Sequence, residues 1–163
     1  MYLLDANVFI AAKNHHYGFA IAPGFWRWPE REYDAGTVCS IDKVYNEIAA
    51  GEDELAEWAK HNASIFVGGD AAMVRSLREL ASWARTSGRF TPAASSEFLS
   101  VADCYLVAFA HAHELIVATH EQPDHRARKR IKIPEACDYL GVSWTDPFTM
   151  LEQEHATLVL DEP

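Results

Sequence analysis

Two acidic residues flank the most apolar stretch of the chain. Nine of the ten residues Val101–Ala110 are apolar, which predicts a buried helix, and the aliphatic run Leu115–Ala118 predicts a short strand after it. Asp103 lies in the first turn of that helix, and Glu121 follows that strand. A carboxylate in such a setting needs a partner. Ser100 and Asp103 have the spacing of a capping box, so one interpretation gives Asp103 a purely structural role.

Two further acids accompany predicted elements nearer the N-terminus. Asp5 directly follows the apolar run Tyr2–Leu4, which predicts a strand. Glu47 lies on a helix predicted from Ser40 to Ala50, about 60° round the axis from Val44 and so at the border of the apolar face. That face consists of Ile41, Val44, Tyr45 and Ile48. A border glutamate is ordinarily just solvated, and this is the plainer interpretation of Glu47.

The chemistry of four such carboxylates depends on whether they meet. If they converge on one edge of a sheet, they repel one another strongly unless a cation lies among them. A site made of oxygen ligands, without Cys or His, suits Mg²⁺ or Mn²⁺. Ions of this kind align a phosphodiester and lower the pKa of a bound water so that it can attack.

Positive charge is concentrated directly after Glu121. Five of the 14 basic residues fall within seven positions: Arg126, Arg128, Lys129, Arg130 and Lys132. The net charge of −10 argues against a protein that coats nucleic acid over its whole surface. It leaves room for a local site, because phosphate contacts supply affinity and position. The alternative is that this basic run is only a solvated face.

Strands separated by helices predict how these residues are brought together. The alternation begins with a strand and indicates an α/β fold, a three-layer α/β/α sandwich with a mainly parallel central sheet. In such sheets, ligand sites form at the carboxyl ends of the strands. The length and the 49% apolar content indicate one domain, residues 1–163. His15–Gly36 lacks a clear period and is predicted as a loop with a helical turn or two. Its Trp26 and Trp28 are expected to pack over the edge of the core, and a stacking platform for bases is the alternative.

The sequence also predicts the environment of the chain. Cys39, Cys104 and Cys137 are odd in number and widely spaced, which favours reduced core residues over disulfides. The longest apolar run is well short of the roughly 20 residues that a membrane span requires. The N-terminus lacks the pattern of a signal peptide. We therefore expect a cytoplasmic protein that does not enter a membrane.

Four short motifs, taken in order, resemble the PIN-domain ribonucleases over nearly the whole chain. The motifs are Leu3–Asn7, Val44–Glu47, Ala102–Asp103 on an alanine-rich helix, and Val117–Glu121. The ending, Ile133–Cys137 with Leu140–Val142, looks like a PIN subfamily without an assigned function. Each motif is weak alone, and their order and spacing make the resemblance fairly specific.

This resemblance implies a PIN-like fold and a metal-dependent endoribonuclease that hydrolyses RNA phosphodiester bonds. By position, Asp5 and Asp103 would be the central ligands of one or two Mg²⁺ or Mn²⁺ ions, Glu47 a ligand or base, and Glu121 the fourth acid. Many PIN domains carry Asp where this chain has Glu121, so Asp124 stays open as a substitute. Second-shell residues, Asn7 and Thr119, would orient the carboxylates. The RNA-binding residues would be Arg126, Arg128, Lys129, Arg130 and Lys132.

Partners and competing functions follow from the same residues. The resemblance implies RNA as substrate, a homodimer and, because the family includes the toxins of toxin–antitoxin pairs, a cognate antitoxin protein; DNA in place of RNA stays open. A catalytically silent PIN-like scaffold or interaction module is the main alternative. A zinc site is disfavoured because His111 and His113 point about 200° apart on a helix. A dehalogenase-type phosphatase is disfavoured because Asn7 stands where that class has a second Asp.

Overall fold

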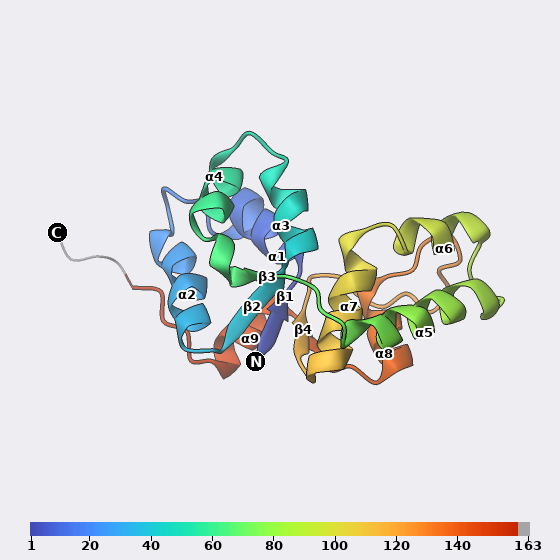
Figure 1. Cartoon of the computed structure of the whole chain (residues 1–163). Helices are drawn as coiled ribbons and strands as arrows, with labels where there is room; N and C mark the ends of the chain where they lie inside the picture. The colour runs from blue at the N-terminus through green and yellow to red at the C-terminus, as the bar shows by residue number, and fades with distance from the viewer. Residues whose placement is uncertain (160–163) are drawn as a thin grey trace.

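The computed structural model describes residues 1–159, in which one five-stranded sheet forms the centre (Figure 1). The strands are β1 (Tyr2–Leu4), β2 (Val38–Ile41), β3 (Phe66–Val67), β4 (Ile116–Ala118) and β5 (Trp144–Thr145). They pair in the order β3-β2-β1-β4-β5, and every pair is parallel. The predicted α/β/α sandwich with a mainly parallel sheet is therefore confirmed. Residues 160–163 of the predicted domain lie outside the described residues.

Helices cover the sheet from both sides. They are α1 (Ala6–Ala11), α2 (Pro23–Asp34), α3 (Asp42–Ala49), α4 (Glu54–His61), α5 (Met73–Thr86), α6 (Pro92–Phe98), α7 (Ala102–His113), α8 (Ile133–Leu140) and α9 (Pro147–Gln153). A π-helical turn, Ala12–His16, extends α1, and a 3₁₀ turn, Ala63–Ile65, precedes β3. In Figure 1, α5 to α8 lie to the right of the sheet, and α2 and α4 lie to its left.

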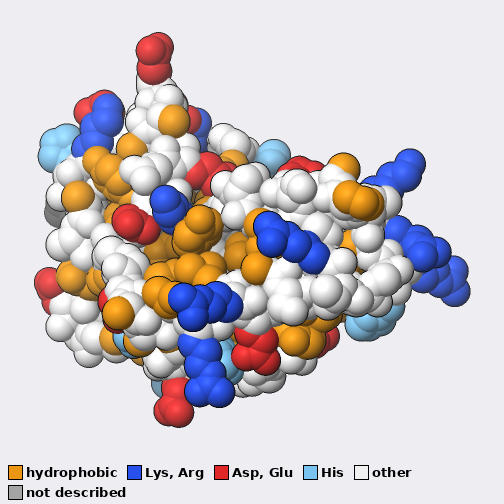
Figure 2. All heavy atoms as spheres, turned by 45° about the vertical axis from the view of Figure 1, so that its right-hand side comes forward, with side chains coloured by type: hydrophobic (Ala, Val, Ile, Leu, Met, Phe, Trp, Pro, Cys, Tyr) orange, Lys and Arg blue, Asp and Glu red, His pale blue; other side chains and the backbone are white. Residues whose placement is uncertain are grey.

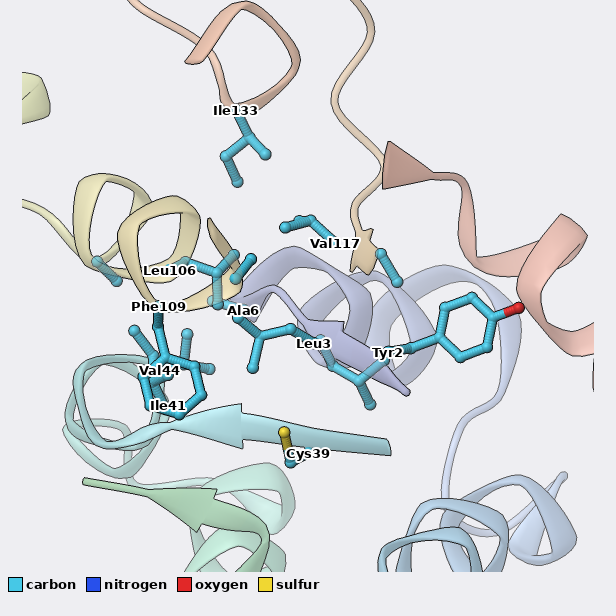
Figure 3. Packing of buried hydrophobic residues seen from close by; sticks show 14 of the residues in the cluster. Tyr2, Leu3, Ala6, Cys39, Ile41, Val44, Leu106, Phe109, Val117 and Ile133 are labelled. Atoms are coloured by element: carbon cyan, nitrogen blue, oxygen red, sulfur yellow. The ribbon is translucent and has the colours of Figure 1, made fainter. Parts of the chain in front are cut away.

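The core is built between β1, β4 and the apolar helix α7. The strands are short and buried, as expected for a parallel sheet that is covered on both faces. Leu106 of α7 and Ile133 of α8 point toward Leu3 and Val117 of the two central strands (Figure 3). All four side chains are fully buried. Burial of this kind stabilises by roughly 1.5–3 kcal/mol for each large aliphatic side chain.

The strand order fixes where a ligand site can form. From β1 the chain moves to β2 and β3 on one side, and it then crosses back to place β4 and β5 on the other side of β1. The connections therefore leave β1 and β4 in opposite directions, which makes the gap beyond their carboxyl ends the topological switch point. Leu4 pairs with Ala118 there. The next residues in the two strands, Asp5 and Thr119, consequently lie side by side.

The prediction of a loop over residues 15–36 is wrong in its second half. Pro23–Asp34 forms a twelve-residue helix that begins with Pro23 and contains Pro29 in its interior. An interior proline normally breaks a helix because it removes a hydrogen bond and clashes with the preceding turn. Here Phe25, Trp26 and Trp28 are all buried in the core, so tertiary packing offsets the local cost. The core position predicted for the two tryptophans is confirmed.

Three smaller features concern caps, thiols and membranes. Ser40 lies within β2 and donates its hydroxyl to the Leu4 carbonyl oxygen at 2.7 Å, so the helix predicted from Ser40 begins two residues later, at Asp42. The three cysteines are free and buried, as predicted. Among residues 1–159, no single helix is long and apolar enough to cross a membrane, although the bent pair α6 and α7 passes that test together.

Candidate acidic site at the carboxyl edge of the sheet

Asp5 is buried at the switch point and is held by a short hydrogen-bond network. Its side chain is only 3% exposed. Thr119 donates its hydroxyl to Oδ2 of Asp5 at 2.9 Å. Asn7 donates its Nδ2 to the Thr119 hydroxyl oxygen at 3.2 Å and accepts from the backbone N–H of His120 at 3.0 Å. The two side chains predicted to orient the carboxylates thus contact Asp5 directly or through one hydroxyl.

Asp103 lies in the first turn of α7, beside this network. The residue that caps the helix is Val101, and the Ser100 hydroxyl donates backwards to the Glu97 carbonyl oxygen at 2.8 Å. The capping-box interpretation of Ser100 and Asp103 is therefore wrong. The Asp103 carboxylate is left to face the acidic site with only partial exposure to water.

Burial and neighbouring acidic charges raise the proton affinity of both aspartates. Burial raises the pKa of Asp5 from 3.8 to about 8; the Asp103 charge is the next cause, and the Thr119 hydrogen bond opposes the rise. Burial also raises the pKa of Asp103, to about 6, with the Glu121 charge second and Arg130 acting in the opposite direction. Glu47 adds to the rise at Asp103. The four predicted acids therefore belong to one electrostatic cluster.

Glu121 belongs to this cluster by charge, but its oxygens are occupied. Oε1 accepts from Arg130 Nη2 at 2.6 Å, and Oε2 accepts from the backbone N–H of Ile133 at 2.7 Å. The second contact satisfies a free backbone donor at the start of α8. A ligand role for Glu121 would require Arg130 to release Oε1. The possible substitute, Asp124, is exposed and accepts from the backbone N–H of Arg126 at 3.1 Å.

We expect Glu121→Gln to destabilise the protein, because the substitution disrupts these two contacts. The free energy of unfolding should fall by about 1–3 kcal/mol, since the Gln amide keeps one acceptor oxygen while its NH₂ group cannot accept, so one of the two hydrogen bonds is lost. Chemical denaturation of this variant beside Glu79→Gln, an exposed carboxylate of α5, measures the loss. Equal stability of the two variants would show that the contacts at Glu121 contribute nothing.

A cavity of about 460 Å³ opens beside Asp103. Asp103 and Glu47 line it, together with Arg130 from the basic run. The sequence interpretation missed three of its polar residues, Lys43, Glu97 and Tyr105. Only the position of Lys43 carried a signal: it precedes Glu47 by four residues on one helix, which places the two on the same face. The cavity therefore combines carboxylates with two cations and an aromatic ring.

The basic run forms the loop between β4 and α8. Arg128 donates its Nε to the Arg89 carbonyl oxygen at 3.2 Å, and Lys132 donates its Nζ to the Gln122 carbonyl oxygen at 2.9 Å. The run's five members are exposed except Lys132, which is half-buried. On the face shown in Figure 2, Lys and Arg side chains stand beside a central area of hydrophobic side chains.

The donor chemistry of the cluster fits a hard divalent cation. Within residues 1–159, no three Asp, Glu, His or Cys side chains are arranged to hold an ion as they stand. Mg²⁺, however, commonly takes only one or two carboxylates and keeps several waters. Asp5 and Asp103 supply two carboxylates whose mutual repulsion a cation would relieve.

The fold and the cluster together define an α/β protein with an acidic site at the switch point of a parallel sheet. The chain belongs to the family DUF4411, described as a domain of unknown function, whose profile matches residues 2–158. Comparisons with curated proteins and with solved structures give no significant match.

Proposed function

We propose that this protein is a divalent-metal-dependent ribonuclease that hydrolyses RNA phosphodiester bonds at the acidic cluster. The observation that carries the proposal is the coupling of two poorly solvated carboxylates, Asp5 and Asp103, at the switch point. Their ionisation is opposed by burial and by neighbouring acidic charges, that of Asp103 at Asp5 and that of Glu121 at Asp103, which is costly for the fold alone. Arrangements of this kind occur at functional sites more than elsewhere. The resemblance to PIN-domain ribonucleases in the order of the acidic motifs supports the same reading.

Each residue has a distinct role in this proposal. Asp5 and Asp103 hold one Mg²⁺ or Mn²⁺ ion, which supplies an activated water and charge stabilisation when bound. Thr119 keeps the Asp5 carboxylate in one orientation through its 2.9 Å hydrogen bond. Glu47, which is exposed at the cavity wall, would accept a proton from the attacking water. Glu121 adds the fourth negative charge and holds Arg130 at the rim.

The basic loop supplies affinity for the RNA backbone. Arg130 lines the cavity itself, and Arg126, Arg128 and Lys129 are exposed along the same loop. Their contacts with phosphates would position the strand without reading its sequence. The resemblance also supports a homodimer and an antitoxin partner as further proposals.

A direct cleavage assay tests this function. Labelled single-stranded and structured RNAs are incubated with the purified protein in Mn²⁺, in Mg²⁺ and in chelator. We expect cleavage in either metal and none in chelator. Metal-independent cleavage, or no cleavage of any RNA together with no saturable Mn²⁺ binding by calorimetry, would contradict the proposal.

A silent binding module is the second candidate, and two observations favour it. Glu121 is already paired with Arg130, and no three-ligand metal group is preformed within the described residues. In that case the cavity would bind a partner without chemistry. The calorimetric titration separates the two candidates, because a scaffold has no saturable Mn²⁺ site.

Lys129 tests the role of the basic loop without disturbing a contact at the acidic cluster. We expect Lys129→Gln to weaken RNA binding severalfold at low salt and to reduce the slope of log K against log[salt] by about 0.7, which corresponds to one lost phosphate contact on a single strand. Fluorescence anisotropy over a salt series measures both. Lys60→Gln, which removes an exposed lysine on α4, is the matched control, and equal slopes for the two variants would count against the loop.

A further inference from the structure

A second, smaller cavity adjoins the acidic one and shares two residues with it. It has a volume of about 190 Å³ and lies between α3, α5 and α7. Lys43 and Tyr105 line both cavities and so form the partition between them. The Lys43 ammonium lies 5.1 Å from the centroid of the Tyr105 ring, which is within the range of a cation–π contact.

The walls of the smaller cavity differ from those of the acidic one. They are mainly apolar and include Ile41, Met73, Val74 and Leu77. Val74 is 42% exposed, so its side chain can contact a ligand that enters from solvent. One carboxylate, Asp42, also lines this cavity from the first turn of α3.

We propose that the smaller cavity is a nucleobase subsite for the nucleotide next to the scissile phosphate, and that it prefers cytosine over uracil. The proposal rests on the nuclease function proposed above. The cavity is well below the roughly 300–1,000 Å³ of a site for a whole ligand, so it suits one planar base. The base would stack on Tyr105 and pack against Val74, while its phosphate lies on the acidic side of the partition and contacts Lys43.

The preference for cytosine follows from Asp42. Its carboxylate can only accept hydrogen bonds at neutral pH, and cytosine offers an exocyclic amino group as donor where uracil offers a carbonyl acceptor. The other carboxylate at this cavity, Asp70, is already engaged: Oδ1 accepts from the backbone N–H groups of Ala72 and Met73, and Oδ2 lies 3.0 Å from Nε2 of His113. Asp42 is therefore the acceptor assigned to the base.

Binding of short oligonucleotides in chelator tests the subsite without cleavage. The probes are fluorescein-labelled oligocytidine, oligouridine and an abasic oligomer of the same length. We expect the wild type to bind oligocytidine about tenfold more tightly than the abasic oligomer, the effect of one stacked base. Tyr105→Leu and Val74→Gln should remove that difference, whereas Asp42→Asn should remove only the preference for cytosine over uridine. Ile21→Gln, at an 84% exposed position, is the control.

Lys43→Gln separates the phosphate contact from the base contact. It should weaken all three probes and lower the salt slope, since it removes one cation near the backbone. Equal wild-type affinity for abasic and natural probes, no binding of any probe, or an unchanged ratio in Tyr105→Leu would overturn the subsite. If RNA is cleaved in a metal-dependent way but Tyr105→Leu does not change the affinity for oligocytidine relative to the abasic oligomer, the nuclease proposal stands and the subsite is removed. If that relative affinity depends on Tyr105 but no RNA is cleaved, the subsite stands as a base-binding site and the nuclease proposal is removed.

Discussion

Asp103→Asn is expected to lower the rate of metal-dependent RNA cleavage by about a thousandfold, the size of effect expected when a charged ligand of a catalytic ion is lost. The same substitution should raise the melting temperature at pH 8 in chelator. Burial and the charge of Glu121 raise the pKa of Asp103 to about 6, so its ionised form is disfavoured in the fold at that pH. Loss of activity and gain of stability should therefore appear together.

This pairing of effects separates the proposed function from a structural role at the helix start. If Asp103 served only to support α7, Asn would be neutral or destabilising, and any loss of cleavage would follow a loss of folded protein. The measurements are single-turnover cleavage in Mn²⁺ and thermal unfolding by circular dichroism. Asp34→Asn, at an exposed position near the end of α2, is the control that should change neither. A variant that cleaves at the wild-type rate would end the four-carboxylate interpretation.

Asp5→Asn is expected to stabilise the metal-free protein, and by more as the pH rises. The folded-state pKa of about 8 lies above the ordinary 3.8, so the folded protein keeps a proton that the unfolded chain releases. Stability associated with Asp5 is therefore full below pH 3.8, is lost as the pH rises from 3.8 to about 8, and stays lost above that. Removing this cost should contribute on the order of 5 kcal/mol at pH 8, which is the linkage value for a pKa raised from 3.8 to about 8.

The experiment compares melting temperatures of wild type and Asp5→Asn in chelator across this pH range. The difference should be near zero at pH 4 and reach roughly 10–20 °C at pH 8. Saturating Mn²⁺ should then raise the melting temperature of the wild type and leave the variant unchanged, because the variant has lost one of the two carboxylates that bind the ion. A difference that is constant with pH would show that Asp5 ionises as freely in the fold as in the unfolded chain.

The two predictions for Asp103 and Asp5 depend on the acidic cluster at the carboxyl ends of β1 and β4. The sequence could locate the members of this cluster but not their arrangement. Local patterns place acids beside the apolar runs Tyr2–Leu4 and Leu115–Ala118, because strand and helix periods can be read from neighbouring residues. The pairing of β1 with β4, which sets Asp5 beside Thr119, joins segments more than a hundred residues apart. Its register is fixed by side-chain packing against α7.

Other parts of the site also divide into local features that the sequence predicted and contacts that only the folded chain creates. The sequence predicted a basic loop next to an acidic site, and the structure places Arg130 in the cavity wall. The sequence could not show that Glu121 is held by Arg130 and by the start of α8. Both contacts depend on how the loop between β4 and α8 folds back. Tyr105 escaped notice because a tyrosine on a helix carries no distinctive pattern until a cavity forms around it, whereas the four-residue spacing of Lys43 and Glu47 did carry a signal.

By itself, the sequence determined the α/β class, the buried character of α7 and the residues that could bind a cation, because apolar periodicity and residue chemistry are local properties. Tertiary structure alone decided the helix Pro23–Asp34, whose Pro29 argues locally against it and whose buried aromatic residues stabilise it. It also decided the raised pKa values of Asp5 and Asp103. Those shifts arise from burial and from charges brought together across the chain, and neither exists before the sheet and α7 have packed.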